Sequence, residues 1–181
     1  MGKSVVVSAY DPAWANRFVE LGESLRAAMG EIALRIDHIG STSVVGLAAK
    51  PISDIQISVR SFEPFTRILH PLQALGYRWE ADNPAKTKRY FREPLGQLEI
   101  HVHVRLAGSY CEQHALLFRD YLRSNRQDCT AYGDLKLELA RKFSDDREAY
   151  QIAKSDFIWE ITRRAHRWGS ATGWVAGKSD A

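Results

Sequence analysis

The sequence predicts an α+β fold, in which a mixed or antiparallel sheet with flanking helices precedes a bundle of helices. Two observations support this class. Up to about residue 106, short stretches of alternating apolar and polar residues are bounded by Gly, Pro or Asp, which is typical of strands. From Tyr110 onward this alternation stops, and apolar residues recur at helical spacing.

Each element of the first part follows from a local pattern. Asp11 and Pro12 provide an N-cap and a first-turn proline, and apolar residues then recur at helical spacing up to Gly30. Alternation or bounded apolar runs predict the strands, and Pro71 is expected to kink or shorten the second helix. The expected strands are 5–10, 32–40, 51–60, 77–80, 86–93 and 97–105, and the expected helices are 12–29, 62–75 and a short one at 44–49.

The second part is predicted to contain three helices, at about 111–124, 128–143 and 145–167. No linker rich in Pro, Gly or Ser separates it from the first part, so we expect the two to pack tightly. The last stretch is small and polar apart from Trp174 and Val175, which indicates disorder. The resulting division is a core at 1–108, packed helices at 109–168 and a disordered tail at 169–181.

Composition limits the classes of function. The chain has 181 residues, 45% of them hydrophobic, and a net charge of +3, so it can bury a sizeable core. Because no basic stripe or block is present, we do not expect nucleic-acid binding; a small anionic substrate fits the charge equally well. Cys111 and Cys129 lack metal-type spacing and are expected to be free thiols. Without a signal peptide or a membrane-length apolar run, we expect a cytoplasmic protein and no membrane association. The sequence does not predict the oligomeric state.

Two predicted strands present polar faces. Alternate side chains of a strand share a face, so Asp54, Gln56 and Ser58 point the same way. If the two strands are neighbours, they build a patch of carboxylates and imidazoles, although a solvated sheet face would show a similar pattern. The residues that share the polar face of the second strand are Glu99, His101, His103 and Arg105.

The stretch "GSTS" at 40–43 is a candidate phosphate site. Gly40 allows close approach of a ligand to the backbone, and successive N–H groups of such a turn can form an anion nest. Ser41, Thr42 and Ser43 add hydroxyl donors for phosphate oxygens. Many ordinary turns contain Gly and Ser, so the motif alone is weak evidence.

Several basic residues are further candidates for binding an anion. Lys50 precedes a proline before the Asp54 strand, and Arg119 lies one helical turn before Arg123. Lys136 and Lys154 lie in the second and third predicted helices of the bundle. A solvated position at a strand end fits Lys50 equally well. For the helical residues a solvated face is the usual interpretation, and Asp120 offers Arg119 a local ion pair.

The order strand, Gly-Ser, about a dozen residues, then a strand with an acidic residue resembles the nucleotidyltransferase superfamily with the DNA polymerase beta-like fold. The closer resemblance is to the GrpB family of bacterial proteins, some of which are fused to dephospho-CoA kinase. The motifs that carry it are "HIGSTSVVGLAAKPISDIQISV", "HVHV", "FRDYLR" and "AYGDLKLELA…YQIAKSDFI". The resemblance implies that Gly40 and Ser41 hold phosphate, that Asp54 is the first metal carboxylate, and that the second metal position falls on Gln56.

Gln56 departs from the superfamily pattern, because an amide offers one neutral oxygen and no charge to a two-metal site. One Mg²⁺ could still bind through Asp54, substrate phosphates and Glu99. The imidazoles of His101 and His103 favour Mn²⁺ or Zn²⁺. Alternatively, one of these histidines acts as a general base or donates a hydrogen bond to phosphate.

Three hypotheses follow. The first is a nucleotidyltransferase-like protein that binds a nucleotide or another phosphorylated small molecule between sheet and bundle and, if active, transfers a nucleotidyl group with Mg²⁺ or Mn²⁺. The second is a catalytically inactive binding or regulatory module that has lost its metal pair at Gln56. The third is a phosphotransfer or hydrolase activity that uses His101 and His103. The motifs of P-loop, Rossmann, zinc-protease and serine-hydrolase enzymes are absent from the sequence.

Overall fold

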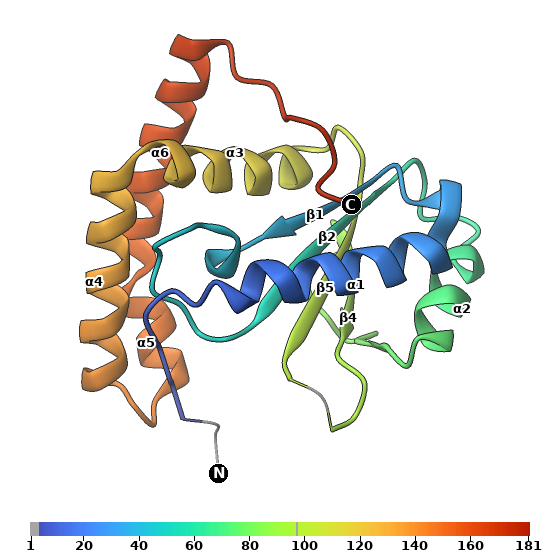
Figure 1. The fold of residues 1–181 in the computed structure, drawn as a ribbon, viewed down its shortest axis with the longest axis horizontal. Helices are drawn as coiled ribbons and strands as arrows, with labels where there is room; N and C mark the ends of the chain where they lie inside the picture. Colours follow the sequence, from blue (N-terminus) through green and yellow to red (C-terminus); the bar gives the residue numbers. More distant parts are fainter. Residues whose placement is uncertain (1–3, 97) are drawn as a thin grey trace.

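A five-stranded mixed sheet forms the centre of the computed structural model, which describes residues 4–96 and 98–181 (Figure 1). The strand order is β1-β2-β5-β4-β3. All neighbouring strands are antiparallel except β2 and β5, which are parallel. This arrangement confirms the predicted α+β class. The strands are β1 (Arg35–Ile39), β2 (Ser53–Val59), β3 (Arg78–Trp79), β4 (Lys88–Arg92) and β5 (Ile100–Leu106).

Helices cover the sheet in two groups (Figure 1). The first, α1 (Ala13–Met29) and α2 (Thr66–Ala74), packs on the apolar face of the sheet. The second group forms the bundle, whose first helix α3 contacts β1 and β5. No helix in the described part of the chain is both long and apolar enough to cross a membrane. The bundle helices are α3 (Tyr110–Ser124), α4 (Arg126–Lys142), α5 (Arg147–Ala153) and α6 (Ser155–Thr172).

The predicted alternation of strand faces is confirmed. Ile55 and Ile57 of β2 and Val102 and Val104 of β5 are fully buried against α1 and α2. The opposite face carries the polar residues and is covered in part by α3, whose Glu112 accepts a hydrogen bond from Ser58 Oγ at 2.7 Å. One face of the sheet therefore contributes to the hydrophobic core, and the other presents polar side chains that can form a site.

The loop after β1 packs into the bundle. Val44 and Leu47 lie in one apolar cluster with residues of α3, α4 and α6. A short 3-10 turn, η2 (Ser41–Ser43), begins this loop, and Gly40 precedes it. The sheet and the bundle thus hold the 40–43 turn between them.

Four local predictions differ from the structure. The stretch 5–10 makes only an isolated bridge between Ser8 and Ala49 instead of a strand. The stretch 44–49 is a turn, because Gly46 adopts a positive φ of 83° that interrupts a helix. The helix predicted over 145–167 is two helices, α5 and α6, which meet at Lys154.

The predicted disordered tail is the fourth difference. α6 continues to Thr172, and Gly173, with φ 65°, ends it as a left-handed cap. Residues 174–181 then return to the edge of β1 and hydrogen-bond to it (Figure 1). Small polar side chains that suggested disorder, those of Ser179 and Asp180, accept hydrogen bonds from the outward backbone N–H groups of β1.

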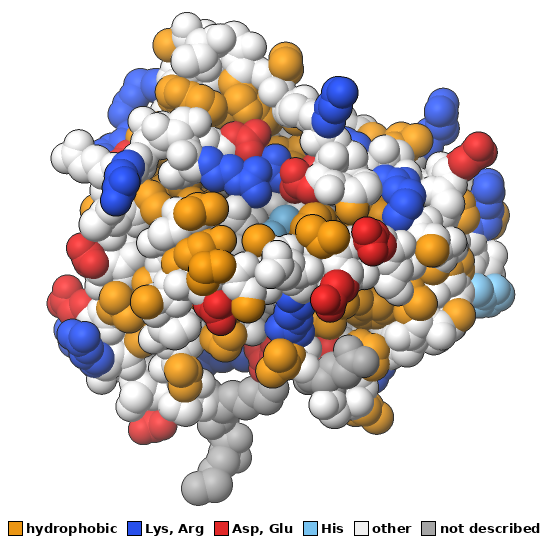
Figure 2. All heavy atoms as spheres, viewed as in Figure 1, with side chains coloured by type: hydrophobic (Ala, Val, Ile, Leu, Met, Phe, Trp, Pro, Cys, Tyr) orange, Lys and Arg blue, Asp and Glu red, His pale blue; other side chains and the backbone are white. Residues whose placement is uncertain are grey.

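Charged side chains are spread over the surface. On the face shown in Figure 2, Lys and Arg side chains alternate with Asp and Glu, and no single extended basic patch dominates the view. Both cysteines are free, as predicted.

Replacing Ile57 by Ala tests the packing of β2 against α1 and α2. Because Ile57 is fully buried in the core cluster, we expect the free energy of unfolding to fall by about 2–5 kcal/mol. Urea denaturation measures the change. Val19 of α1 is 51% exposed, so Val19→Ala is the control and should alter stability by no more than about 0.5 kcal/mol. Equal effects of the two substitutions would contradict the assignment of the core face.

Candidate functional site

Asp54 lies at the centre of the polar face of the sheet. The parallel register of β2 and β5 places Asp54 opposite His101 and Gln56 opposite His103. Asp54 Oδ1 is 3.1 Å from His101 Nδ1 and 3.3 Å from His103 Nε2. Three residues that the sequence predicts on two separate strands therefore meet at one carboxylate oxygen.

The protonation of His103 follows from its surroundings. Burial lowers the pKa of His103 to about 4, so the ring is neutral at pH 7. Lys88 Nζ lies 3.0 Å from Nδ1 of the ring, and an ammonium group can only donate. Nδ1 is therefore the acceptor, and Nε2 carries the proton that is donated to Asp54.

The two ring nitrogens of His101 differ in their hydrogen bonding. Its Nδ1 faces the Asp54 carboxylate, whereas its Nε2 is buried and has no hydrogen-bond partner among the described residues. Burial by itself raises the pKa of Asp54, but the hydrogen bonds from His101 and His103 outweigh it and hold this pKa well below its usual value. Asp54 is thus an ionised carboxylate that orients both imidazoles.

Gly40 brings the 40–43 turn against Asp54. Its φ is 70°, and a Cβ atom at this position would lie 2.5 Å from Asp54 Oδ2, so only glycine fits. Ser43 Oγ donates to the carbonyl of Gly40 at 2.6 Å. Thr42 Oγ1 lies 3.0 Å from His38 Nε2. Thr42 and Ser43 hold the turn in shape, whereas the hydroxyl of Ser41 contacts Lys136 of α4.

A cleft of about 210 Å³ opens beside Ser41 and Asp54 and gathers four basic side chains, so we call it the cationic cleft. Lys136 of α4 is only 3% exposed, and its Nζ donates to Ser41 Oγ at 2.9 Å. The residues that line the cleft are Ser41, Thr42, Lys50, Ile52, Asp54, His101, Lys136, Arg147, Tyr150, Gln151 and Lys154.

The basic residues of the cleft disfavour one another's charge. Burial, reinforced by Lys154 and Lys50, lowers the pKa of Lys136 to about 7. Burial, reinforced by Lys50, lowers the pKa of Lys154 to about 8. Lys136 packs against the ring of Tyr132 at 4.3 Å, and neither Lys136 nor Lys154 forms an ion pair with a carboxylate in the described chain. The cleft therefore gathers amino groups that form no close ion pair in the described chain, and the ionised Asp54 that lines the same cleft offsets only part of their mutual repulsion.

An apolar chamber of about 310 Å³ adjoins the cationic cleft and shares Ser41 and Asp54 with it. His114 Nδ1 at the chamber wall is buried and has no hydrogen-bond partner among the described residues. The two spaces together could hold a ligand with an anionic and an apolar part. The apolar residues of the chamber are Ile39, Val44, Ala115, Phe118, Leu122, Tyr132 and Ile158.

Gln56 has a structural role in its present position. Its side chain is fully buried, and Oε1 accepts a hydrogen bond from Arg105 Nη1 at 2.5 Å. Its Nε2 donates to the carbonyl of Glu112 at 3.3 Å. Because this amide oxygen already has a cationic partner, Gln56 does not fit the position of a second metal ligand.

The donor set that remains can hold one cation. Asp54, His101 and His103 each offer a ligand atom, and these atoms lie within 4.8 Å of one another. One carboxylate and two imidazoles suit Mn²⁺ or Zn²⁺ better than Mg²⁺. Coordination through His103 Nε2 requires the other tautomer of that ring, so Lys88 would have to move or lose a proton.

The structure brings most of the predicted site residues together, but not all. Gly40, Ser41, Thr42, Lys50, Asp54, His101, His103, Lys136 and Lys154 lie at or beside the cationic cleft. Glu99 lies in a neighbouring hollow, 3.9 Å from Arg92. Arg119 is 4% exposed and donates to the carbonyl of His38, so it supports β1, and it also lines the apolar chamber beside the cleft.

Sequence reasoning missed Arg147, Tyr150 and Gln151 of α5, which line the cleft. Arg147 follows two aspartates at a helix start, a context that indicates only a solvated helix end. It also missed the partnership of Lys88 with His103, which depends on the pairing of β4 with β5. Tyr150 and Gln151 begin the motif "YQIAKSDFI", but nothing local in the sequence shows that Arg147 or Lys88 faces the site.

Solved structures similar to this chain share its fold. A crystal structure of the conserved protein GrpB from Enterococcus faecalis has a TM-score of 0.83 and 34% identity, and the match covers 90% of this chain and 98% of that one. The structure of Cid1 in complex with the UTP analog UMPNPP has a TM-score of 0.51 at 13% identity, over 81% of this chain and 48% of that one. The second likeness is one of fold alone and supports the predicted nucleotidyltransferase-like architecture.

Sequence relatives lead to the same family. The UPF0157 proteins PA4798 of Pseudomonas aeruginosa and YqkA of Bacillus subtilis are 37% and 35% identical, over 86% and 92% of this chain. The chain spans 65% and 48% of the lengths of these two relatives. A dephospho-CoA kinase of Mycolicibacterium paratuberculosis is 33% identical, over 91% of this chain and 46% of that protein. The GrpB protein family model matches residues 4–164, and the chain therefore belongs to the GrpB family.

Proposed function

We propose that this chain binds a nucleotide or another phosphorylated small molecule, with the phosphates in the cationic cleft beside the 40–43 turn. The main support for this proposal is the environment of Lys136. This lysine is nearly buried, contacts Ser41 and has no carboxylate partner in the described chain. Burying an unpaired ammonium group is unfavourable, and a bound anion removes that penalty.

The surroundings of Lys136 suit several phosphate groups better than one carboxylate. Lys50, Lys154 and Arg147 line the same cleft, so its positive charge is spread over several side chains. The Ser41 hydroxyl and the backbone of the turn add neutral donors. A polyphosphate chain carries enough oxygens and charge to engage these groups at once.

The proposed reaction class is nucleotidyl transfer, assisted by one divalent ion held by Asp54 with His101 and His103. When bound there, a divalent ion would neutralise charge on the phosphates and polarise the phosphorus–oxygen bond. The chain's own groups would bind the phosphates through Ser41 and the lysines. If His101 is not a ligand of that ion, its Nε2, which has no partner among the described residues, can instead accept the proton of the attacking hydroxyl group while the bond from phosphorus to the departing pyrophosphate breaks.

A second candidate is a binding module without catalysis. It is favoured by Gln56, whose amide is held by Arg105 and Glu112 where the fold would otherwise present a second carboxylate. The apolar chamber beside Ser41 and the Cid1 likeness support a nucleotide as ligand under either candidate.

A ligand and metal screen tests the binding proposal. We expect inorganic triphosphate and ATP to raise the Tm of the wild-type chain. At a ligand concentration one hundred times Kd, the free energy of unfolding should rise by about 2.7 kcal/mol. Mn²⁺ should add to the shift with ATP in the wild type and not in Asp54→Asn. Asp82→Asn, at an exposed turn, is the control and should behave as wild type. No shift with any phosphate compound would refute the proposed function, and a metal-dependent shift retained in Asp54→Asn would refute the metal role of Asp54.

Lys136→Met should separate stability from binding. The substitution replaces a desolvated ammonium group by an apolar side chain of similar length, so we expect a higher Tm without ligand. Binding of triphosphate, followed by calorimetry, should weaken at least about tenfold. Lys142→Met on the exposed end of the same helix serves as the matched control and should change neither quantity. A lower Tm together with unchanged binding would show that Lys136 is structural.

The pH dependence follows from the lowered pKa of Lys136. Between pH 7 and about 10, the unfolded chain keeps a proton on this lysine that the folded chain has lost, so this group makes stability rise with pH over that window. An anionic ligand favours the protonated lysine, and its affinity should therefore weaken as the pH rises above about 7. Titrations of triphosphate between pH 6 and pH 9 should show this slope in the wild type and a shallower slope in Lys136→Met. Equal slopes in the two proteins would contradict the assigned role.

A further inference from the structure

β1 is an edge strand, and residues 177–181 cover its open side. The backbone groups of Ile36 and His38 point away from β2 and would otherwise lack partners. Ser179 Oγ accepts from Ile36 N at 2.8 Å, and the backbone nitrogens of Asp180 and Ala181 donate to Ile36 O at 3.1 Å. These contacts come from a part of the chain outside residues 4–164, which the family model matches.

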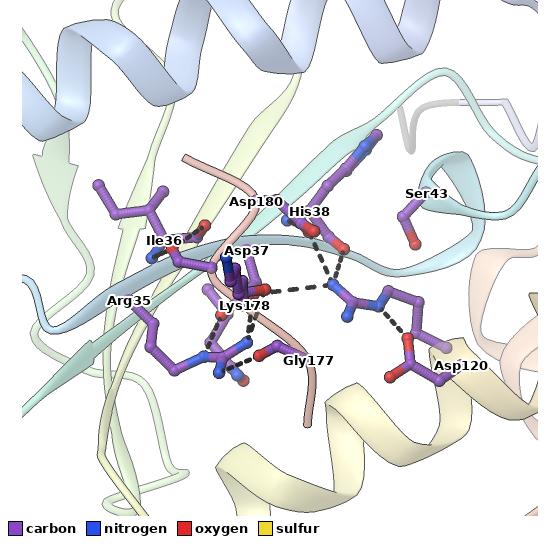
Figure 3. A network of polar contacts seen from close by, with 12 residues as sticks. Arg35, Ile36, Asp37, His38, Ser43, Asp120, Gly177, Lys178 and Asp180 are labelled. Atoms are coloured by element: carbon purple, nitrogen blue, oxygen red, sulfur yellow. Dashed lines mark hydrogen bonds and ion pairs between the residues drawn. The ribbon is translucent and has the colours of Figure 1, made fainter. Parts of the chain in front are cut away.

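Both backbone groups of His38, its N–H and its C=O, are hydrogen-bonded on the open side of β1. Asp180 Oδ2 accepts from His38 N at 2.9 Å, and Arg119 Nη1 of α3 donates to His38 O at 3.0 Å. Arg119 Nη1 also lies 2.7 Å from Asp180 Oδ2. Figure 3 shows Asp180 beside His38. One carboxylate and one guanidinium group therefore fix the residue that lies two positions before Gly40.

Two arginines of α3 bracket the 40–43 turn. Arg119 holds the carbonyl of His38 before the turn, and Arg123 Nε donates to the carbonyl of Ser43 at 3.0 Å. Asp120 joins them, since its Oδ1 lies 2.8 Å from Arg119 Nε and 3.8 Å from Arg123 Nη1. We call Arg119, Asp120 and Arg123 the arginine clamp.

The stretch 174–181 contacts the arginine clamp through two side chains. Trp174 Nε1 donates to Asp120 Oδ2 at 3.1 Å, and Asp180 pairs with Arg119. Arg119 is 4% exposed, so loss of the Asp180 carboxylate would remove one of the anionic partners of a buried cation. Removal of the whole side chain would also leave the outward N–H of His38 without its acceptor, whereas the amide oxygen of Asp180→Asn can still accept from it.

We propose that residues 177–181 form a strap that holds the 40–43 turn in its phosphate-binding position, and that Asp180 is the positioning residue. The inference rests on the proposed function, because it assigns the strap an effect on phosphate affinity. Asp180 does not line the cationic cleft and acts through Arg119 and His38. When the strap is docked, the turn keeps Ser41 beside Lys136; when it is released, the end of β1 and the turn lose this support.

The test compares triphosphate affinity in Asp180→Asn and in the wild type by calorimetry, well below the unfolding temperature of both. We expect binding to weaken about fivefold, at the low end of typical coupling between sites. Asp180→Glu, which keeps the charge, should recover most of the affinity. Lys178→Ala is the control within the segment, because the Lys178 side chain is exposed and only its carbonyl makes a contact. Linkage also requires that bound triphosphate slow hydrogen exchange at the His38 amide in the wild type.

A merely structural role of Asp180 would lower Tm and leave affinity unchanged in the folded protein. That result, with no ligand-dependent protection at His38, would overturn the strap. Failure of the wild-type chain to bind triphosphate would instead refute the proposed function, so the two failures are distinguishable. Reduced affinity in Asp180→Asn with recovery in Asp180→Glu supports the strap.

Discussion

The parallel pairing of β2 with β5 is the constraint on which the site depends. It sets Asp54 beside His101 and brings His103 within reach of the same carboxylate oxygen. The period of a strand then sends the alternate residues into the core against α1 and α2. A one-residue slip would exchange the two faces, burying the charged groups and exposing the isoleucines, so the stability of the core also maintains the geometry of the site.

The phosphate-binding part of the proposed site depends on the close approach of the 40–43 turn to the Asp54 carboxylate. Gly40 lies so near Asp54 that no side chain fits, and this contact joins the 40–43 turn to the sheet. From the opposite side, α4 places Lys136 against Ser41. The Asp54 carboxylate and the Lys136 amino group therefore lie on two sides of the same 40–43 turn. A buried lysine with no carboxylate partner in the described chain loses its proton more easily than an ordinary lysine, and its charged form becomes favourable when an anion binds.

Much of the fold could be predicted from the sequence, because the strands alternate cleanly and the helices keep their apolar spacing. The histidine and carboxylate faces were predictable for the same reason, and so was the candidate turn at Gly40. What could not be predicted depends on tertiary packing. Nothing near Lys136 shows that α4 buries it, and nothing near Arg119 shows that its partner is Asp180, sixty-one residues later. The small polar residues at the end of the chain indicated disorder because their partners are backbone groups of a distant edge strand.

The binding proposal depends on a buried lysine, Lys136, whose charged form is stabilised by a bound anion. NMR titration of the Lys136 side chain, with carbon-13 at Cε, measures this directly in the free and triphosphate-bound chain. We expect Lys136 to titrate near pH 7 in the free protein and triphosphate to raise its pKa toward the ordinary lysine value. An ordinary lysine pKa in the free protein, unchanged by triphosphate, would refute the proposed role of Lys136.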